Sequence, residues 1–114
     1  MLEYLLSGKI IHIYALYLIY YKIMYMKNDF LKAEAKEVVN SVVYFITDDL
    51  EDGLTEGIFF EGVSSEFYDA LEDDKFTNSL NDKVEKLLKK QGKDVSVDFA
   101  QDDDNEIMIE WALQ

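Results

Sequence analysis

Residues 29–46 read DFLKAEAKEVVNSVVYFI, a run in which apolar side chains return at steps of three and four. An α-helix has 3.6 residues per turn, so this spacing gathers them on one broad face and predicts a helix over residues 29–47. Asn28 or Asp29 is the expected N-cap, because a short side-chain oxygen accepts from the unpaired N–H groups of the first turn. So wide an apolar face needs a sheet or further helices packed against it. The residues expected on this face are Leu31, Ala35, Val38, Val39, Val42, Val43, Phe45 and Ile46.

Downstream of this helix, alternation of apolar and polar residues predicts a sheet. The alternation runs through residues 94–100 and again through residues 106–113, on either side of the polar loop Gln101–Asn105. This arrangement is typical of a hairpin of two antiparallel strands. A third, short strand is expected over residues 57–63, where three apolar residues are flanked by glycines.

Two further helices are expected between the first strand and the hairpin. A short helix over residues 65–72 follows a serine cap at Ser64 or Ser65, since a hydroxyl oxygen accepts from the first turn. A longer helix covers residues 77–91, where apolar residues again recur at steps of three and four. Gly92 is expected to end it, because glycine adopts the left-handed backbone that follows many helices.

Acidic residues are expected to separate these elements. The run Thr47–Gly57 holds several acids and two glycines and is predicted to be a loop. Asp73 and Asp74 are expected to interrupt the helical structure between the two later helices, because negative charge is unfavourable at a helix C-terminus. The predicted fold is therefore α+β, a three-stranded, mostly antiparallel sheet packed by helices on one face.

The stretch that precedes this region has a different composition. Residues 10–26 are nearly all isoleucine, leucine, tyrosine and methionine, interrupted by His12 and Lys22, and predict an additional apolar helix. Three interpretations fit this helix: a membrane anchor, a helix that packs on the domain or on a partner, and a leader outside the functional protein. Its length is at the lower limit for spanning a bilayer, and each buried tyrosine hydroxyl needs a hydrogen-bond partner. The chain thus divides into an apolar, Tyr-rich segment over residues 1–27 and an acidic α+β domain over residues 28–114.

Net charge is the strongest signal in the composition, because the 114 residues carry a formal charge of −13. Residues 1–28 hold three of the 11 lysines and a single acid, so nearly all of the 24 acidic residues lie in residues 29–114. This acidity argues against direct binding of nucleic acid or anionic lipid and favours a basic partner, although solubility alone also explains it. The chain has no cysteine and no arginine, which excludes disulfides, thiolate metal sites and arginine clamps on phosphate.

The sequence offers no catalytic constellation, so we expect no enzymatic activity, no cofactor and no metal site. His12, the single histidine, lies in the apolar segment without a serine or an acid at useful spacing. The five glycines stand singly, without the spacing of a phosphate-binding loop. If Gly53 were the turn glycine of an EF-hand, Leu50 and Phe59 would stand where that loop needs acidic ligands, so calcium coordination is not expected.

With catalytic, cofactor and metal sites not expected, the acidic surface is the feature through which this chain could recognise a partner. B-form DNA presents regularly spaced negative charges, and carboxylates one helical turn apart, about 6 Å, imitate that spacing. Three clusters are therefore the candidate partner-binding residues. The first cluster is Asp48, Asp49, Glu51, Asp52 and Glu56, the second is Glu66, Asp69, Glu72, Asp73 and Asp74, and the third is Asp102, Asp103, Asp104 and Glu106.

These clusters favour a non-enzymatic, cytoplasmic protein-binding module that occupies a basic cleft, as a nucleic-acid mimic does. In size and charge the chain is similar to small phage-encoded inhibitors of restriction or CRISPR nucleases, a likeness of composition only. Two alternatives stay open. One is a membrane-tethered protein with residues 10–26 as anchor and the acidic domain facing the cytosol. The other is a structural or regulatory subunit that forms homo-oligomers through its N-terminal helix.

Overall fold

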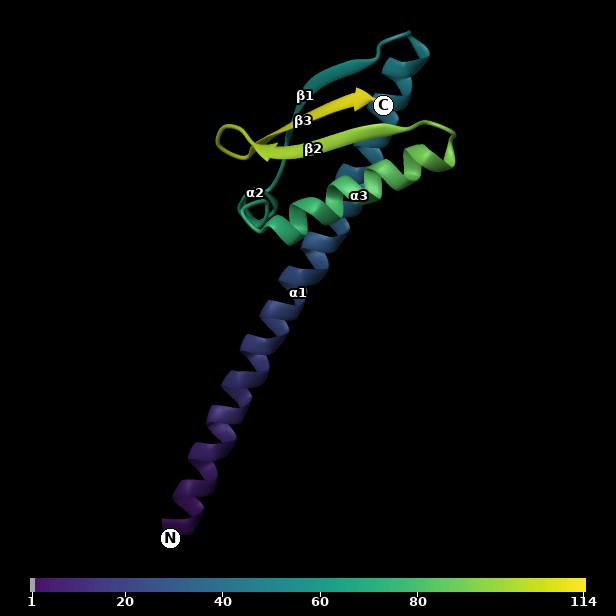
Figure 1. The fold of residues 1–114 in the computed structure, drawn as a ribbon. Coiled ribbons are helices and arrows are strands. Elements are labelled where there is room, and N and C mark those ends of the chain that lie inside the picture. Colours follow the sequence, from purple (N-terminus) through teal and green to yellow (C-terminus); the bar gives the residue numbers. More distant parts are fainter. Residues whose placement is uncertain (1) are drawn as a thin grey trace. The chain divides into compact units, whose positions relative to one another are not determined.

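The structure, a computed structural model, describes the backbone of residues 2–114 and the side chains of residues 15–19 and 28–114. It confirms the α+β fold, with a three-stranded antiparallel sheet packed by helices (Figure 1). The helices are α1 (Leu2–Glu51), α2 (Ser65–Ala70) and α3 (Asp74–Lys90), and the strands are β1 (Glu56–Gly62), β2 (Val95–Gln101) and β3 (Glu106–Leu113).

The first helix is longer than the sequence predicts. α1 runs without a break through Asn28 and Asp29, so the predicted helix start at those residues is wrong. Both residues adopt helical backbone inside α1, and the cost of placing Asn or Asp in a helix interior is only a fraction of a kcal/mol, up to about 0.7 kcal/mol. The chain divides into two compact units, Met1–Lys32 and Ala33–Gln114, with their boundary inside α1.

In the first unit, the described side chains of Ala15–Ile19 are all exposed. The other side chains of the predicted apolar segment, at 10–14 and 20–26, lie outside the described residues. The anchoring and packing roles predicted for this segment depend on those side chains and stay predictions. Among the residues that the structure describes, none of the helices carries an apolar run long enough to cross a bilayer.

The sheet has β3 at its centre, with β1 and β2 as its two edge strands, both antiparallel to β3. Ile109 of β3 lies opposite Phe59 of β1 on one side and opposite Phe99 of β2 on the other. Every second residue of a strand points to the same face, so this register sends one apolar set inward against the helices. The buried core of residues 33–114 is Ala35, Val38, Val39, Val42, Ile46, Phe67, Leu71, Leu80, Val84, Leu88, Val95, Val97, Phe99, Ile107, Ile109 and Trp111.

The end of α1 differs from the predicted loop over Thr47–Gly57. The helix continues to Glu51, and Gly53 then takes a left-handed backbone with φ +89°. The N–H groups of Gly53 and Leu54 donate to the carbonyls of Leu50 and Asp49, at 3.1 and 3.0 Å. This is the Schellman arrangement, in which a glycine just beyond the helix satisfies the last carbonyls.

The start of α3 also differs from the prediction, which placed it near residue 77. Asp73 is the N-cap, because its side chain accepts a hydrogen bond from the Lys75 N–H at 3.0 Å. An acid is favourable at a helix N-terminus, so Asp73 begins α3 rather than ending α2 unfavourably. The expected cap of α2 at Ser64 is confirmed, as is the end of α3 at Gly92, whose φ is +76°.

The part of α1 in the second unit runs along β1 in the opposite direction. The Glu34 carboxylate accepts hydrogen bonds from the backbone N–H and the hydroxyl of Ser64, two residues after the end of β1. About three turns further along the helix, the Phe45 ring contacts the Phe59 ring, with centroids 5.7 Å apart. The last turns of α1 therefore pack against the inner face of β1.

α3 lies beside β2 and covers its edge (Figure 1). Asn81 Oδ1 accepts a hydrogen bond from the Phe99 N–H at 3.1 Å, and Glu85 Oε1 accepts from the Val97 N–H at 3.4 Å. Asn81 and Glu85 are four residues apart and thus on one helix face, and they match two edge N–H groups two residues apart on the strand. Side chains of α3 therefore take the place of a fourth strand beside β2.

Candidate functional site

The outer face of the sheet carries a mixture of apolar and acidic side chains. The helices of residues 33–114 pack on the inner face, and Ile58 and Phe60 on the outer face are 59% and 54% exposed. Exposed apolar residues beside one another on a sheet are typical of an interaction surface. The outer-face residues are Glu56, Ile58, Phe60, Ser96, Asp98, Ala100, Glu106, Met108, Glu110 and Ala112.

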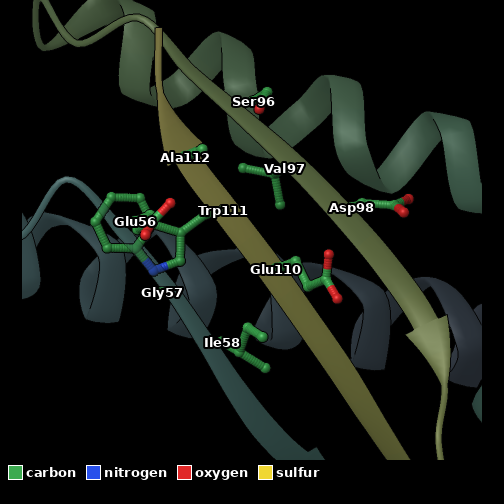
Figure 2. A pocket seen from close by; sticks show the side chains of 9 residues that line it. All are labelled: Glu56, Gly57, Ile58, Ser96, Val97, Asp98, Glu110, Trp111 and Ala112. Carbon is green, nitrogen blue, oxygen red and sulfur yellow. The ribbon is translucent and has the colours of Figure 1, made fainter.

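One end of this face is hollowed. A hollow of about 670 Å³ crosses all three strands, and Figure 2 shows the side chains that line it. Strand register arranges these side chains in two rows. Asp98, Glu110 and Ile58 form one row, and Ser96, Ala112 and Glu56 form the next. The hollow thus presents three carboxylates around a small apolar floor.

Two of the carboxylates in the hollow stand on neighbouring strands. Asp98 of β2 lies directly opposite Glu110 of β3, and like charges in such a position destabilise a sheet. Asn81 Nδ2 donates a hydrogen bond to Asp98 Oδ1 at 3.3 Å, which partly satisfies this carboxylate. A cationic ligand placed between Asp98 and Glu110 would lower the repulsion between them.

Behind the hollow, Trp111 and Gly57 are in close contact. A Cβ atom on Gly57 would lie only 2.6 Å from Trp111 Nε1, so only glycine fits beside this indole. Trp111 Nε1 is buried without a hydrogen-bond partner, as is Glu61 Oε2 on the same strand as Gly57. Burial raises the pKa of Glu61, and a hydrogen bond from Ser41 opposes this rise.

The three predicted clusters lie at two ends of the second unit. The first cluster covers the last turn of α1 and the start of β1, beside the end of β3. The second cluster lies on α2, the short connection after it and the start of α3, and the third lies in the β2–β3 turn and at the first residue of β3. Because Gly62 pairs with Glu106 and Val63 donates to the Asn105 carbonyl, the segment that begins the second cluster leaves the sheet beside the third. Clusters two and three therefore share one end, and cluster one occupies the other.

The carboxylates of these clusters face solvent. All members are exposed except Asp49, which is half-buried. Within residues 28–114, no ion pair with a lysine involves a member of the first or third cluster, and the hydrogen bonds that Asp73 and Asp103 accept come from backbone N–H groups. The negative charge of the first and third clusters therefore remains available to a partner.

Only Glu56 belongs to both the predicted clusters and the hollow, and the prediction left out Asp98 and Glu110. Both residues stand at outward positions of the predicted strands, so their shared face could have been inferred from period-two alternation. Their direct opposition depends on the pairing register of β2 and β3, which the length of the connecting turn sets.

No group of three or more potential ligands within the described residues is arranged to hold a metal ion. No protein-family model, no curated protein and no solved structure matches this chain.

Proposed function

We propose that this chain is a non-enzymatic acidic binding module whose ligand is a basic segment of another protein. The observation that carries the proposal is the opposition of Asp98 and Glu110 on an uncovered sheet face. Two like charges held together by strand register cost stability in the unbound domain, and a lysine or arginine side chain in the hollow offsets that cost.

The apolar part of the hollow defines the ligand further. Ile58 is exposed beside Glu110, and Ala112 lies in the next row. A ligand that covers this floor needs an apolar or long aliphatic side chain next to its cation, a combination that lysine and arginine stems provide. The ligand is therefore a cationic segment that lies against the open sheet rather than a free ion.

The three acidic clusters act over a longer range than the hollow. A net charge of −13 steers a basic partner toward the domain and raises the association rate at low salt. Two clusters at one end of the sheet and one at the other extend the acidic surface well beyond the hollow. A cationic segment that lines a cleft for nucleic acid meets these requirements, and a module bound in such a cleft acts as a nucleic-acid mimic.

The test is a binding titration of the full chain against a panel of DNA-binding nucleases at several salt concentrations. We expect affinity to fall steeply as salt is added, because the contacts are between charges. The double substitution D98N/E110Q is expected to weaken binding by roughly 2- to 30-fold, the value of one or two exposed charge contacts. D48N/E51Q, which removes the same charge from the first cluster, serves as the matched control.

The two variants distinguish the hollow from the general acidic surface. Equal losses for both would mean that net charge alone drives binding and that the hollow has no special role. Binding that does not respond to salt would contradict the proposal.

A further inference from the structure

β1 is an edge strand whose outer backbone is unpartnered. β3 pairs with one side of it, and within residues 33–114 no side chain and no other strand hydrogen-bonds to the other side. The exposed residues Ile58 and Phe60 belong to this same strand. An unprotected edge with apolar side chains is a template for another strand, and such edges are usually blocked in proteins that stay monomeric.

The sequence of β1 is complementary to its own reverse about its centre, because each glutamate mirrors a glycine and Ile58 mirrors Phe60. It reads EGIFFEG, with Phe59 as the middle of seven residues. When two such strands run antiparallel with Phe59 opposite its own counterpart, residue 58 faces 60, residue 57 faces 61 and residue 56 faces 62. All seven residues then pair, and each glutamate faces a glycine of the other strand.

From this edge we infer that a second copy of the chain pairs with β1, in antiparallel register centred on Phe59, to form a continuous six-stranded sheet. The register places no two like charges directly opposite each other on the paired strands, since Glu56 faces Gly62 and Glu61 faces Gly57. The neighbouring registers that keep side chains on the same faces are centred on Ile58 or Phe60, and each places a glutamate opposite a phenylalanine and leaves strand ends unpaired.

The side chains on both faces suit this pairing. On the outer face, Ile58 of one protomer meets Phe60 of the other, an aromatic and β-branched pair that stabilises adjacent strands. On the inner face, Phe59 meets its counterpart, and Phe45 of α1, whose ring contacts Phe59, is exposed, as is the neighbouring Tyr44. Tyr44 and Phe45 contact each other edge to face, so they extend the apolar surface from the strand onto the helix.

Within the described residues, the two buried side-chain atoms without hydrogen-bond partners lie on β1 or next to it. Trp111 Nε1 is a donor and lies over Gly57, and Glu61 Oε2 is an acceptor on the same strand. In the inferred register Glu61 of the second copy faces Gly57 directly. A donor and an acceptor that lack partners within one chain are thereby brought to neighbouring positions across the two chains.

The test is sedimentation velocity of the full chain over a range of protein and salt concentrations. We expect a monomer–dimer equilibrium that strengthens as salt is added, because each copy carries a charge of −13. This salt dependence is opposite to that expected for binding a basic partner. The failure of one proposal can therefore be distinguished from the failure of the other. F60K is expected to raise the dissociation constant of the dimer about tenfold or more, because a lysine on an edge strand opposes pairing.

A100K is the matched control for charge. Ala100 and Phe60 lie in the same row of the outer face, on either side of Met108, but Ala100 belongs to the opposite edge strand. A100K adds the same positive charge and is expected to leave the equilibrium unchanged or slightly strengthened. Circular dichroism of both variants checks that the substitutions preserve the fold.

A chain that stays monomeric at all concentrations and salt conditions would overturn the inference and leave the edge to a strand of a different protein. Dimers that F60K and A100K affect equally would also overturn it, because the copies would then meet through another surface.

Discussion

At one edge of the sheet α3 supplies hydrogen-bond partners to β2, whereas at the other edge β1 has no partner beyond β3 among the described residues. The β2 edge receives Asn81 and Glu85 side chains at its Val97 and Phe99 N–H groups. The β1 edge instead presents exposed Ile58 and Phe60.

This difference follows from where the polar residues of the helices stand. α3 carries an amide and a carboxylate one turn apart on the face that meets β2, so each can reach an N–H group of the strand. α1 meets β1 through the Phe45 ring and the Ser41 hydroxyl, which contact side chains of the strand rather than its backbone. One edge is thus closed from within the chain, and the other is open to an added strand.

The largest expected effect comes from loosening the helix that closes the β2 edge. Leu80 is fully buried on α3, next to Asn81. L80A is expected to reduce the free energy of unfolding by about 2–5 kcal/mol, through lost burial and the cavity left behind. Urea unfolding followed by the fluorescence of Trp111 measures this change. L87A, at a half-buried position of the same helix, should cost less, and an equal cost would contradict the packing described for α3.

A smaller effect is expected from removing one hydrogen-bonding group at the closed edge. N81A leaves the Phe99 N–H without its acceptor and is expected to cost about 1–3 kcal/mol, the value of an unsatisfied buried donor. The Phe99 amide should also exchange with deuterium faster. N78A is the control, because Asn78 is exposed on the same helix and makes no hydrogen bond within the described residues. Similar losses for both variants would show that Asn81 does not close the edge.

The smallest effect concerns the open edge and depends on pH. Burial raises the pKa of Glu61 above its ordinary value, so the folded domain holds this proton more tightly than the unfolded chain. Stability is therefore expected to fall as pH rises from the ordinary glutamate range, about 4.3, through the raised pKa of Glu61. E61Q should flatten this fall, whereas E56Q, at an exposed position of β1, should not. Unfolding free energies measured against pH test this, and identical profiles for E61Q and the parent chain would contradict it.

Sequence patterns predicted the elements of the second unit well, because their periodicities are strong. The alternation in β2 and β3 and the three- and four-residue spacing in α3 depend only on which face is buried. Helix ends were predicted less well. Asp73 was interpreted as a stop for α2, although its side chain reaches forward to cap α3.

The candidate site was predictable only in part. Exposure of the three acidic clusters follows from their charge, since unpaired carboxylates are rarely buried. The hollow and the open edge depend on strand order and register, which place Asp98 beside Glu110 and leave β1 outermost. These features come from long-range pairing, which local periodicity does not specify.

The claim that one edge is closed from within and the other pairs with a second copy is tested most directly by amide hydrogen exchange, read residue by residue at low and high protein concentration. We expect the Val97 and Phe99 amides to be protected equally at both concentrations. Amides of β1 should gain protection only at the higher concentration, where the second strand is present. Protection of β1 that does not change with concentration would contradict the account.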